Sequence, residues 1–379
     1  MATKTVPGPD GSRVETTRKG STYLIRPYES GDADGVVSLL ATHQFSAIDG
    51  TWFQKTYVEN PYLDHVPLFV VESDDEIVGI RPFTAFRVRA GQQCELALLT
   101  RDTLLHPDHR RRGLFTEMTE LALEYYESAE PAFVFSHSNH RSFPGYRKMG
   151  WSSLGHRVTY SRVQNAAPLV DVKTRDTVTT LLSPAASLLS RTHRAVRDRL
   201  STSSPEITVT RHETVPADIL AALYRQHRPE TSHIVRDETF YRWRFQIFEW
   251  QPSTTFVARR DGDPVAAITT VADAGKLSTT SVVDVVPRIG CDRWARAIGA
   301  ALDSAIASHR ETDVLRIPEP AFPVRVLKER GFLPGNRLPL SVLASDKPLT
   351  LGFRPLGDEV RIDGYPVSEA TTELWSVAH

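Results

Sequence analysis

The residues with the clearest chemical potential lie in the run Leu104–Phe115, which reads LLHPDHRRRGLF. The apolar segment Glu95–Leu105 predicts a strand, and the pattern of Leu114–Tyr126 predicts a helix. The turn between them holds Pro107, three consecutive arginines and Gly113. The first N–H groups of a helix have no internal partner and lie at the positive end of its dipole. The sequence therefore predicts an anion site, suited to a phosphate or pyrophosphate, at the start of this helix.

A second group of polar residues follows the next predicted strand, Ala132–Ser136. It includes Asn139, and a short segment beginning at Tyr146 ends at Gly150-Trp151. A strand that ends near Asn139, followed by the spacing Tyr146-x-x-x-Gly150-Trp151, is the second pattern in this chain that could carry chemistry.

The stretch Tyr23–Arg162 resembles a GNAT acyltransferase domain. The basic turn is similar to the coenzyme-A loop of that family, Arg/Gln-x-x-Gly-x-Gly/Ala, in which Arg110 and Gly113 match and Phe115 stands where Gly or Ala is usual. In such a loop backbone N–H groups bind the pyrophosphate and nearby guanidinium groups add charge. The resemblance implies a site for acetyl-CoA formed by Leu104, Leu105, Arg110, Arg111, Arg112, Gly113, Leu114, Phe115 and Asn139.

The same resemblance implies the catalytic roles. Tyr146 occupies the place of the tyrosine that protonates the departing thiolate, and the N–H of Thr103 would polarise the thioester carbonyl. The backbone of Leu105 would pair with the pantetheine. The general base stays open, the candidates being Asp102, Glu95, His137, His140 and the terminal carboxylate of His379. Either the acceptor mouth or the core would hold Trp52, Phe53 and Tyr57.

Composition excludes several other classes of function. The 379 residues include 45 basic and 46 acidic side chains, so no global field favours nucleic acid. Cys94 and Cys291 lie far apart, which predicts neither a disulfide framework nor a zinc site. The polar N-terminus does not resemble a signal peptide, and no apolar run is long enough for a membrane span. We expect a soluble cytoplasmic protein without a metal, and leave homo-oligomerisation open.

The chain also predicts an α/β fold with two similar halves, each a mixed twisted sheet flanked by helices. Three pairs of anchors suggest a duplication: Trp52–Pro61 with Trp243–Pro252, Pro107 with Pro287, and Gly150-Trp151 with Gly331-Phe332. The expected domains are a flexible tail (1–20), a GNAT acetyltransferase domain (21–163), a helical linker (164–205), a degenerate GNAT-like domain (206–346) and a C-terminal extension (347–379).

The second half does not repeat the residues that carry the chemistry. Aligning Pro107 with Pro287 sets Gly113 against Arg293, and aligning Gly150 with Gly331 sets Tyr146 against Leu327. We therefore expect the first half to transfer an acetyl group from acetyl-CoA directly to a small-molecule or peptide amine. Two alternatives stay open: a non-catalytic acyl-CoA-binding module, and an aminoacyl-tRNA-dependent transferase of the tandem-domain ligase type.

Overall fold

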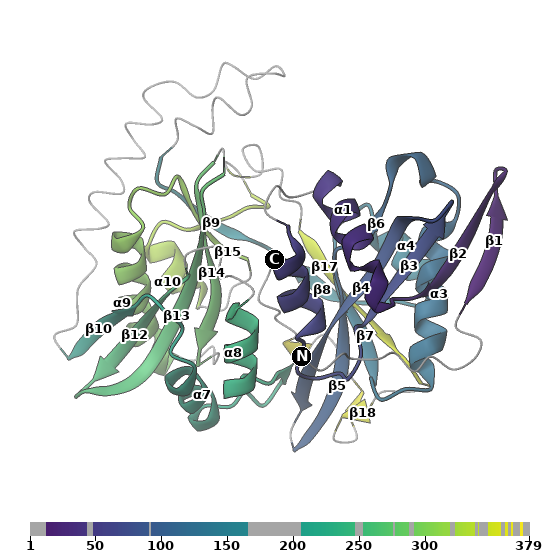
Figure 1. Cartoon of the computed structure of the whole chain (residues 1–379). Helices are drawn as coiled ribbons and strands as arrows, with labels where there is room; N and C mark the ends of the chain where they lie inside the picture. The colour runs from purple at the N-terminus through teal and green to yellow at the C-terminus, as the bar shows by residue number, and fades with distance from the viewer. Residues whose placement is uncertain are drawn as a thin grey trace. The chain divides into compact units, whose positions relative to one another are not determined.

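The structure is a computed structural model (Figure 1). It describes residues 13–43, 48–90, 92–165, 206–246, 253–275, 277–287, 292–318, 323–337, 340, 348–357, 361–362, 365–366 and 372–373. Nearly all of the expected helical linker (164–205) and the terminal His379 lie outside these residues. The described chain forms two compact units, and the first contains residues of Met1–His156, Glu230–Val235 and Leu349–Leu374.

The first unit is built on a mixed sheet. Its strands follow the order β1 (Val14–Arg18), β2 (Ser21–Pro27), β3 (Leu68–Ser73), β4 (Glu76–Ala90), β5 (Gln93–Thr100), β7 (Phe133–Ser138), β17 (Leu349–Pro355) and β8 (Ser152–Arg157). Off this path, β4 also pairs with β6 (Leu104–Leu105) and β11 (Ser232–Ile234), and β11 pairs with β20 (Thr372–Glu373). Neighbours from β1 to β5 are antiparallel, whereas β5 and β7 run parallel.

Both faces of this sheet are covered because its central strands are apolar on both sides. In β3, Phe69 and Val71 pack into one cluster, whereas Leu68 and Val70 pack into another, as the two-residue period of a strand requires. The first cluster is closed by α3 (Leu114–Glu127) and α4 (Phe143–Lys148). The second is closed by α1 (Ala33–His43), α2 (Gly50–Phe53) and the π-helical turn η2 (Gln54–Val58).

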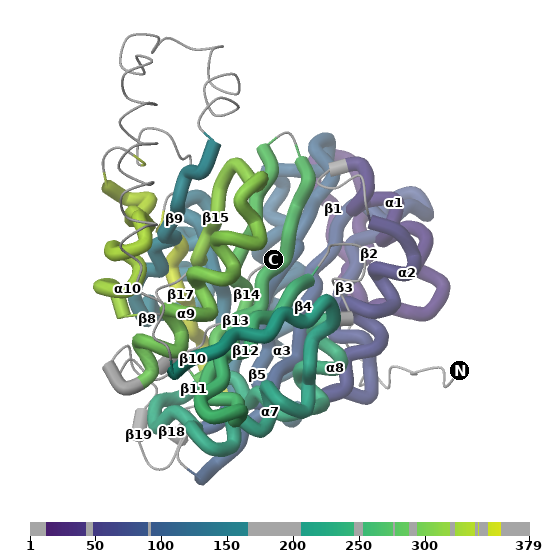
Figure 2. Tube along the Cα trace, turned by 90° about the vertical axis from the view of Figure 1, so that its left-hand side faces the viewer, coloured from purple at the N-terminus to yellow at the C-terminus, as the bar shows by residue number. Residues whose placement is uncertain are grey.

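The second unit contains its own mixed sheet (Figure 2). Its strands follow the order β10 (Ile207–His212), β12 (Ser253–Arg260), β13 (Asp263–Asp273), β14 (Thr279–Val286), β15 (Val314–Ile317), β9 (Tyr160–Val163) and β16 (Leu333–Pro334). Its helices are α7 (Ala217–Gln226), α8 (Glu238–Gln246), α9 (Asp292–Ser308) and α10 (Val324–Glu329). An α/β fold with two mixed sheets is thus confirmed.

Two strands differ from the sequence expectation. The end of the expected first domain (21–163) forms β9, which pairs with β15 and β16 in the second sheet. The first sheet instead receives β17, which pairs with β7 and comes from the C-terminal extension. Local patterns identify a strand but not its partner, because pairing over about 200 residues leaves no local signal.

Neither a membrane-spanning helix nor a metal-binding group occurs among the described residues. No helix there is both long and apolar enough to cross a membrane. No group of three or more His, Cys, Asp or Glu side chains gathers there in a way that could hold a metal ion.

The close packing of β17 predicts that Gly352→Val destabilises the first unit. A Cβ at Gly352 would lie 2.6 Å from Ser136 Oγ and 3.0 Å from Trp151 Cδ1. We expect the free energy of unfolding in urea to fall by about 1–3 kcal/mol. Gly357→Ala is the matched control, since a Cβ there meets nothing within 4 Å. Equal unfolding midpoints for the two variants would contradict the placement of β17.

Candidate active site

The centre of the candidate site is a β-bulge opposite the middle of β4. Phe83 pairs with Thr100 of β5, and Ile80 pairs with Leu104 of β6. Two residues of β4 therefore oppose the three residues 101–103, and Asp102 adopts a φ of 47°. The single strand expected over 95–105 is consequently broken, because the extra residue interrupts the ladder.

The backbone N–H and C=O groups of Thr103 and Leu105 point away from β4. His106 N–H donates to the Val78 carbonyl at 2.8 Å. Because antiparallel ladders alternate, the backbone groups of Thr103 and Leu105 then point to the other side of the strand. The parallel pairing of β5 with β7 ends at Thr100, and β6 has no pairing with β7 within the described residues. The two strands therefore leave a backbone edge open beside Thr103 and Leu105.

The basic turn follows this edge directly. After the 3₁₀ turn η3 (Pro107–His109), the backbone has a positive φ at Arg111 (58°) and at Gly113 (87°). Gly113 is the N-cap of α3, and no side chain caps that helix end. A Cβ at Gly113 would meet nothing within 4 Å, so glycine is required there by the backbone conformation. The uncapped N–H groups and the helix dipole are the features that the predicted anion site requires.

The three arginines of this turn make different contacts. Arg110 is exposed, and its Nε donates to the Leu105 carbonyl at 2.9 Å. Arg111 is also exposed. Arg112 donates from Nη1 to the Tyr23 hydroxyl at 2.7 Å and so braces the turn against β2. Arg110 and Arg111 thus remain accessible to an anion, whereas Arg112 is mainly structural.

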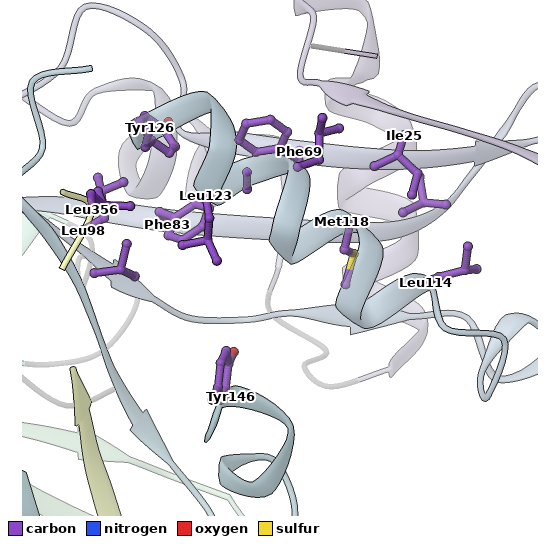
Figure 3. Packing of buried hydrophobic residues seen from close by; sticks show 14 of the residues in the cluster. Ile25, Phe69, Phe83, Leu98, Leu114, Met118, Leu123, Tyr126, Tyr146 and Leu356 are labelled. Carbon is purple, nitrogen blue, oxygen red and sulfur yellow. The ribbon is translucent and has the colours of Figure 1, made fainter. Parts of the chain in front are cut away.

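Tyr146 lies under α3, pointing from α4 toward the buried cluster (Figure 3). Its hydroxyl accepts a hydrogen bond from Arg81 Nη1 at 2.7 Å, and the same Nη1 donates to Thr103 Oγ1 at 2.6 Å. Tyr146 and Thr103 are therefore brought together by Arg81, a residue that the sequence analysis missed. The available signal was an arginine between Ile80 and Pro82, within the largely apolar stretch 77–86.

The surroundings of Tyr146 make its phenol more acidic. Burial is the largest single effect and raises the pKa. The positive charge of Arg81, together with hydrogen bonds from Thr100, Arg81 and Thr103, acts in the opposite direction and outweighs it. The pKa of Tyr146 is therefore lowered from its ordinary value near 10.

Phe115 departs from the usual loop pattern for a reason that the structure makes plain. Its ring meets the Tyr146 ring edge-on, with centroids 5.4 Å apart. A Cβ at Gly145 would lie 3.3 Å from this ring, so the missing side chain at Gly145 makes room for it. Phe115 thus fixes Tyr146 from α3, while its backbone stays at the start of the helix.

Asp102 is placed differently from Tyr146. Its Oδ2 accepts hydrogen bonds from the Tyr57 hydroxyl at 2.6 Å and from Arg101 Nε at 2.7 Å. Tyr57 lies in the other cluster, with Leu104. Burial, followed by the charge of Asp102, raises the pKa of Tyr57 well above 10, which keeps this phenol a donor. A carboxylate held by two such donors is a weak proton acceptor.

The other candidates lie in varied surroundings. Asn139 is exposed, and its Oδ1 accepts the N–H groups of Arg141 and Ser142 at the turn before α4. Glu95 opposes Val88, seven residues and roughly 20 Å along the chain from Asp102. Four of the candidates have side chains that are buried in the two hydrophobic clusters: Trp52, Phe53, Leu104 and Leu114. Only the backbone of these four residues is therefore available to a ligand.

The hydrogen bonds of the Tyr146 hydroxyl come from Arg81, Thr100 and Thr103 and do not involve the two histidine candidates for the general base. His137 belongs to β7 and opposes Leu351 of β17, and its ring meets Phe135 edge-on. His140 is exposed beyond the end of that strand. Both remain predictions.

The second unit repeats backbone features of the first. Both hairpins turn at two residues with positive φ, Asp74-Asp75 and Asp261-Gly262. When residues are counted from these turns, the second unit has a register shift at the same position as the first, where Thr269 opposes Asp284. Asp284 thus corresponds to Asp102. Asp284 accepts a hydrogen bond from the Tyr241 hydroxyl at 2.8 Å, as Asp102 does from Tyr57.

The register also corrects one of the sequence anchors. Val286 opposes Ala267 as Leu104 opposes Ile80, so Pro287 corresponds to Leu105 and not to Pro107. The connection to the next α-helix is then five residues long (287–291), against eight (106–113) in the first unit.

A second anchor agrees with the expected alignment. Trp151 N–H donates to the Tyr146 carbonyl, and Phe332 N–H donates to the Leu327 carbonyl, the same helix-ending motif in both units. Leu327, which is fully buried, therefore stands where the first unit has its phenol.

Comparison with known proteins agrees with this geometry. Residues 24–154 match the family model described as an acetyltransferase (GNAT) domain. Over these residues the first unit is therefore similar to a GNAT acetyltransferase domain. No curated protein matches the sequence significantly.

Solved GNAT structures share the fold over most of the chain. The GCN5-related N-acetyltransferase of Anabaena variabilis has 11% identity and a TM-score of 0.58 over 88% of this chain and 73% of its own. That of Kribbella flavida has 15% identity and a TM-score of 0.53 over 88% and 71%. Eis1 from Mycobacterium abscessus has 13% identity and a TM-score of 0.50 over 88% and 73%. At these identities the likeness establishes the fold alone.

The bonds of Asp102 predict that Tyr57→Phe destabilises the first unit. The substitution removes a hydrogen bond to a carboxylate, so we expect the free energy of unfolding in urea to fall by about 1–3 kcal/mol. Tyr241→Phe should act similarly through Asp284. Tyr160→Phe is the control, because the Tyr160 hydroxyl makes no hydrogen bond within the described residues. Unchanged stability in Tyr57→Phe would contradict the stabilising role of this hydrogen bond.

Proposed function

We propose that the first unit transfers an acetyl group from acetyl-CoA to an amine. The observation that carries this proposal is the order of three features. They are the uncapped start of α3, the backbone edge at Thr103 and Leu105 that has no strand partner within the described residues, and the Tyr146 hydroxyl, which shares Arg81 Nη1 with Thr103 Oγ1. An anion site, an unpaired strand edge and an acid in that order fit a pyrophosphate, an extended amide-containing arm and a thioester.

Each part of the path has a role in binding. The N–H groups of Arg112, Gly113, Leu114 and Phe115 would bind the pyrophosphate, with Arg110 and Arg111 adding positive charge. The backbone edge at Leu105 would pair with the pantetheine amides, and the Thr103 N–H would donate to the thioester oxygen. Arg110 Nε, now on the Leu105 carbonyl, would release that acceptor when the cosubstrate binds.

The chemistry is direct attack of a neutral amine on the thioester carbonyl. Tyr146 donates its proton to the departing thiolate, and its lowered pKa brings the phenol closer to the thiol in acidity. We assign Asp102 to holding the bulge in place, because its carboxylate is engaged by Tyr57 and Arg101. Water would then carry away the proton of the amine.

We propose further that the second unit is a GNAT-like copy without this chemistry. It keeps the turn, the bulge and the helix-ending motif, which supports a common origin. Its connection before α9 is shorter, and Leu327 offers no proton. The second unit is then a scaffold for the first.

Gly113→Glu should abolish binding of acetyl-CoA. A carboxylate at the start of α3 would occupy and repel the pyrophosphate site, and the positive φ of Gly113 adds strain. Gly20→Glu is the matched control, because Gly20 has a similar φ of 83° and equally open surroundings. Calorimetric titration with acetyl-CoA measures the effect. Binding that survives in Gly113→Glu and in the control alike would exclude this site.

Tyr146→Phe should lower kcat by about 10²-fold or more, the range of a general acid, with little change in coenzyme-A affinity. The measurement is release of free thiol across a panel of amines. Wild-type protein that binds acetyl-CoA but never releases thiol would instead support a non-catalytic acyl-CoA-binding module. Full turnover in Tyr146→Phe would show that another group is the acid.

A further inference from the structure

Among the residues that the structure describes, Arg81 is a buried cation without an anionic partner. Its side chain is 0% exposed, and its Nε and Nη2 have no hydrogen-bond partner within the described residues. Two other buried arginines are paired with carboxylates: Arg26 with Asp32, and Arg236 with Asp284. Burying an unpaired charge is costly, so the position of Arg81 calls for a compensating negative charge.

The groups in contact with Arg81 are all neutral in the resting state. Its Nη1 donates to Thr103 Oγ1 and to the Tyr146 hydroxyl. Its guanidinium carbon lies 4.9 Å from the centre of the Phe83 ring and 5.2 Å from that of Tyr146. The phenol of Tyr146 is the group in this set that can become an anion.

We propose that Arg81 is a positioning residue that holds the Tyr146 hydroxyl beside the bulge and stabilises the phenolate formed when Tyr146 protonates the leaving thiolate. The inference rests on the proposed acyl transfer. In the step, the amine nitrogen forms a bond to the acyl carbon and the C–S bond breaks. The phenol O–H bond breaks and an S–H bond forms, so the negative charge moves from sulfur to the phenolate oxygen. The proton lost by the attacking amine reaches the phenolate through water and restores the phenol, and no further reagent is needed.

The electrostatics of the site support this role. Burial alone would raise the pKa of Tyr146, and the charge of Arg81 is the largest effect that lowers it. Without Arg81 the phenol would be a weaker acid and its anion would be less stable. The Thr103 hydroxyl, bound to the same Nη1, aligns Arg81 with the bulge that carries the candidate oxyanion donor.

The first test needs no substrate. Tyrosinate absorbance is titrated with alkali in wild type and Arg81→Met, each compared with its Tyr146→Phe counterpart to isolate one phenol. We expect the Tyr146 transition to move to higher pH in Arg81→Met. Arg87→Met, which changes an exposed arginine of the same strand, should leave the transition unchanged. An unmoved transition in Arg81→Met would overturn the proposal, whatever the catalytic activity.

The second test uses turnover. Arg81→Met should lower kcat by about tenfold or more, without exceeding the 10²–10⁴-fold range of a general acid, and leave coenzyme-A affinity unchanged. Activity falls as pH rises through the Tyr146 pKa, so the alkaline limb should move to higher pH in Arg81→Met. Arg81→Lys, which keeps the charge, should restore part of kcat and should move the alkaline limb part of the way back toward its wild-type position.

A double-substitution cycle separates positioning from a purely structural effect. In the Tyr146→Phe background, Arg81→Met should have little further effect on kcat, because the two residues act through one group. Equal losses in both backgrounds would overturn the proposal. Absence of turnover in wild type, with the Tyr146 transition still moved in Arg81→Met, would reject the acyl transfer and leave the Arg81–Tyr146 coupling in place.

Discussion

The candidate site depends on one extra residue in a strand. Residues 101–103 oppose only two residues of β4, so the ladder slips between Thr100 and Leu104. The slip ends the pairing with β7 and leaves the backbone edge at Thr103 unpaired on that side. It also directs the chain into the turn that starts α3. A regular strand would have kept this edge paired, and the anion site would have adjoined no open backbone.

The sequence predicted the parts of this arrangement that local patterns encode. Apolar periodicity indicated α3 and the strands, and the arginine–glycine turn indicated the anion site, because both depend on neighbouring residues. The bulge at Asp102 was not predictable from the continuous apolar run that contains it. Arg81 was missed because its partners Thr103 and Tyr146 lie 22 and 65 residues away, a distance over which one sequence carries no pairing signal.

If the second unit is a copy without the chemistry, as we propose, the features that it shares with the first unit belong to packing. Its bulge also carries an aspartate, and Asp284 is held by Tyr241 and Arg236 much as Asp102 is held by Tyr57 and Arg101. The second unit therefore has an aspartate held by a tyrosine and an arginine, although it has neither the eight-residue connection nor a phenol at the position of Tyr146. A feature shared by a unit without the acid is better explained by packing than by catalysis, which supports the structural role proposed for Asp102.

The unpaired charge of Arg81 has a consequence for catalysis. An arginine already paired with a carboxylate, such as Arg26, has little further attraction for a second anion. Arg81 has neutral contacts in the resting state, so its interaction strengthens when Tyr146 loses a proton. Only interactions that are stronger in the transition state than in the ground state accelerate a reaction. A carboxylate beside Arg81 would relieve the cost of burial and, for the same reason, cancel its effect on the phenolate.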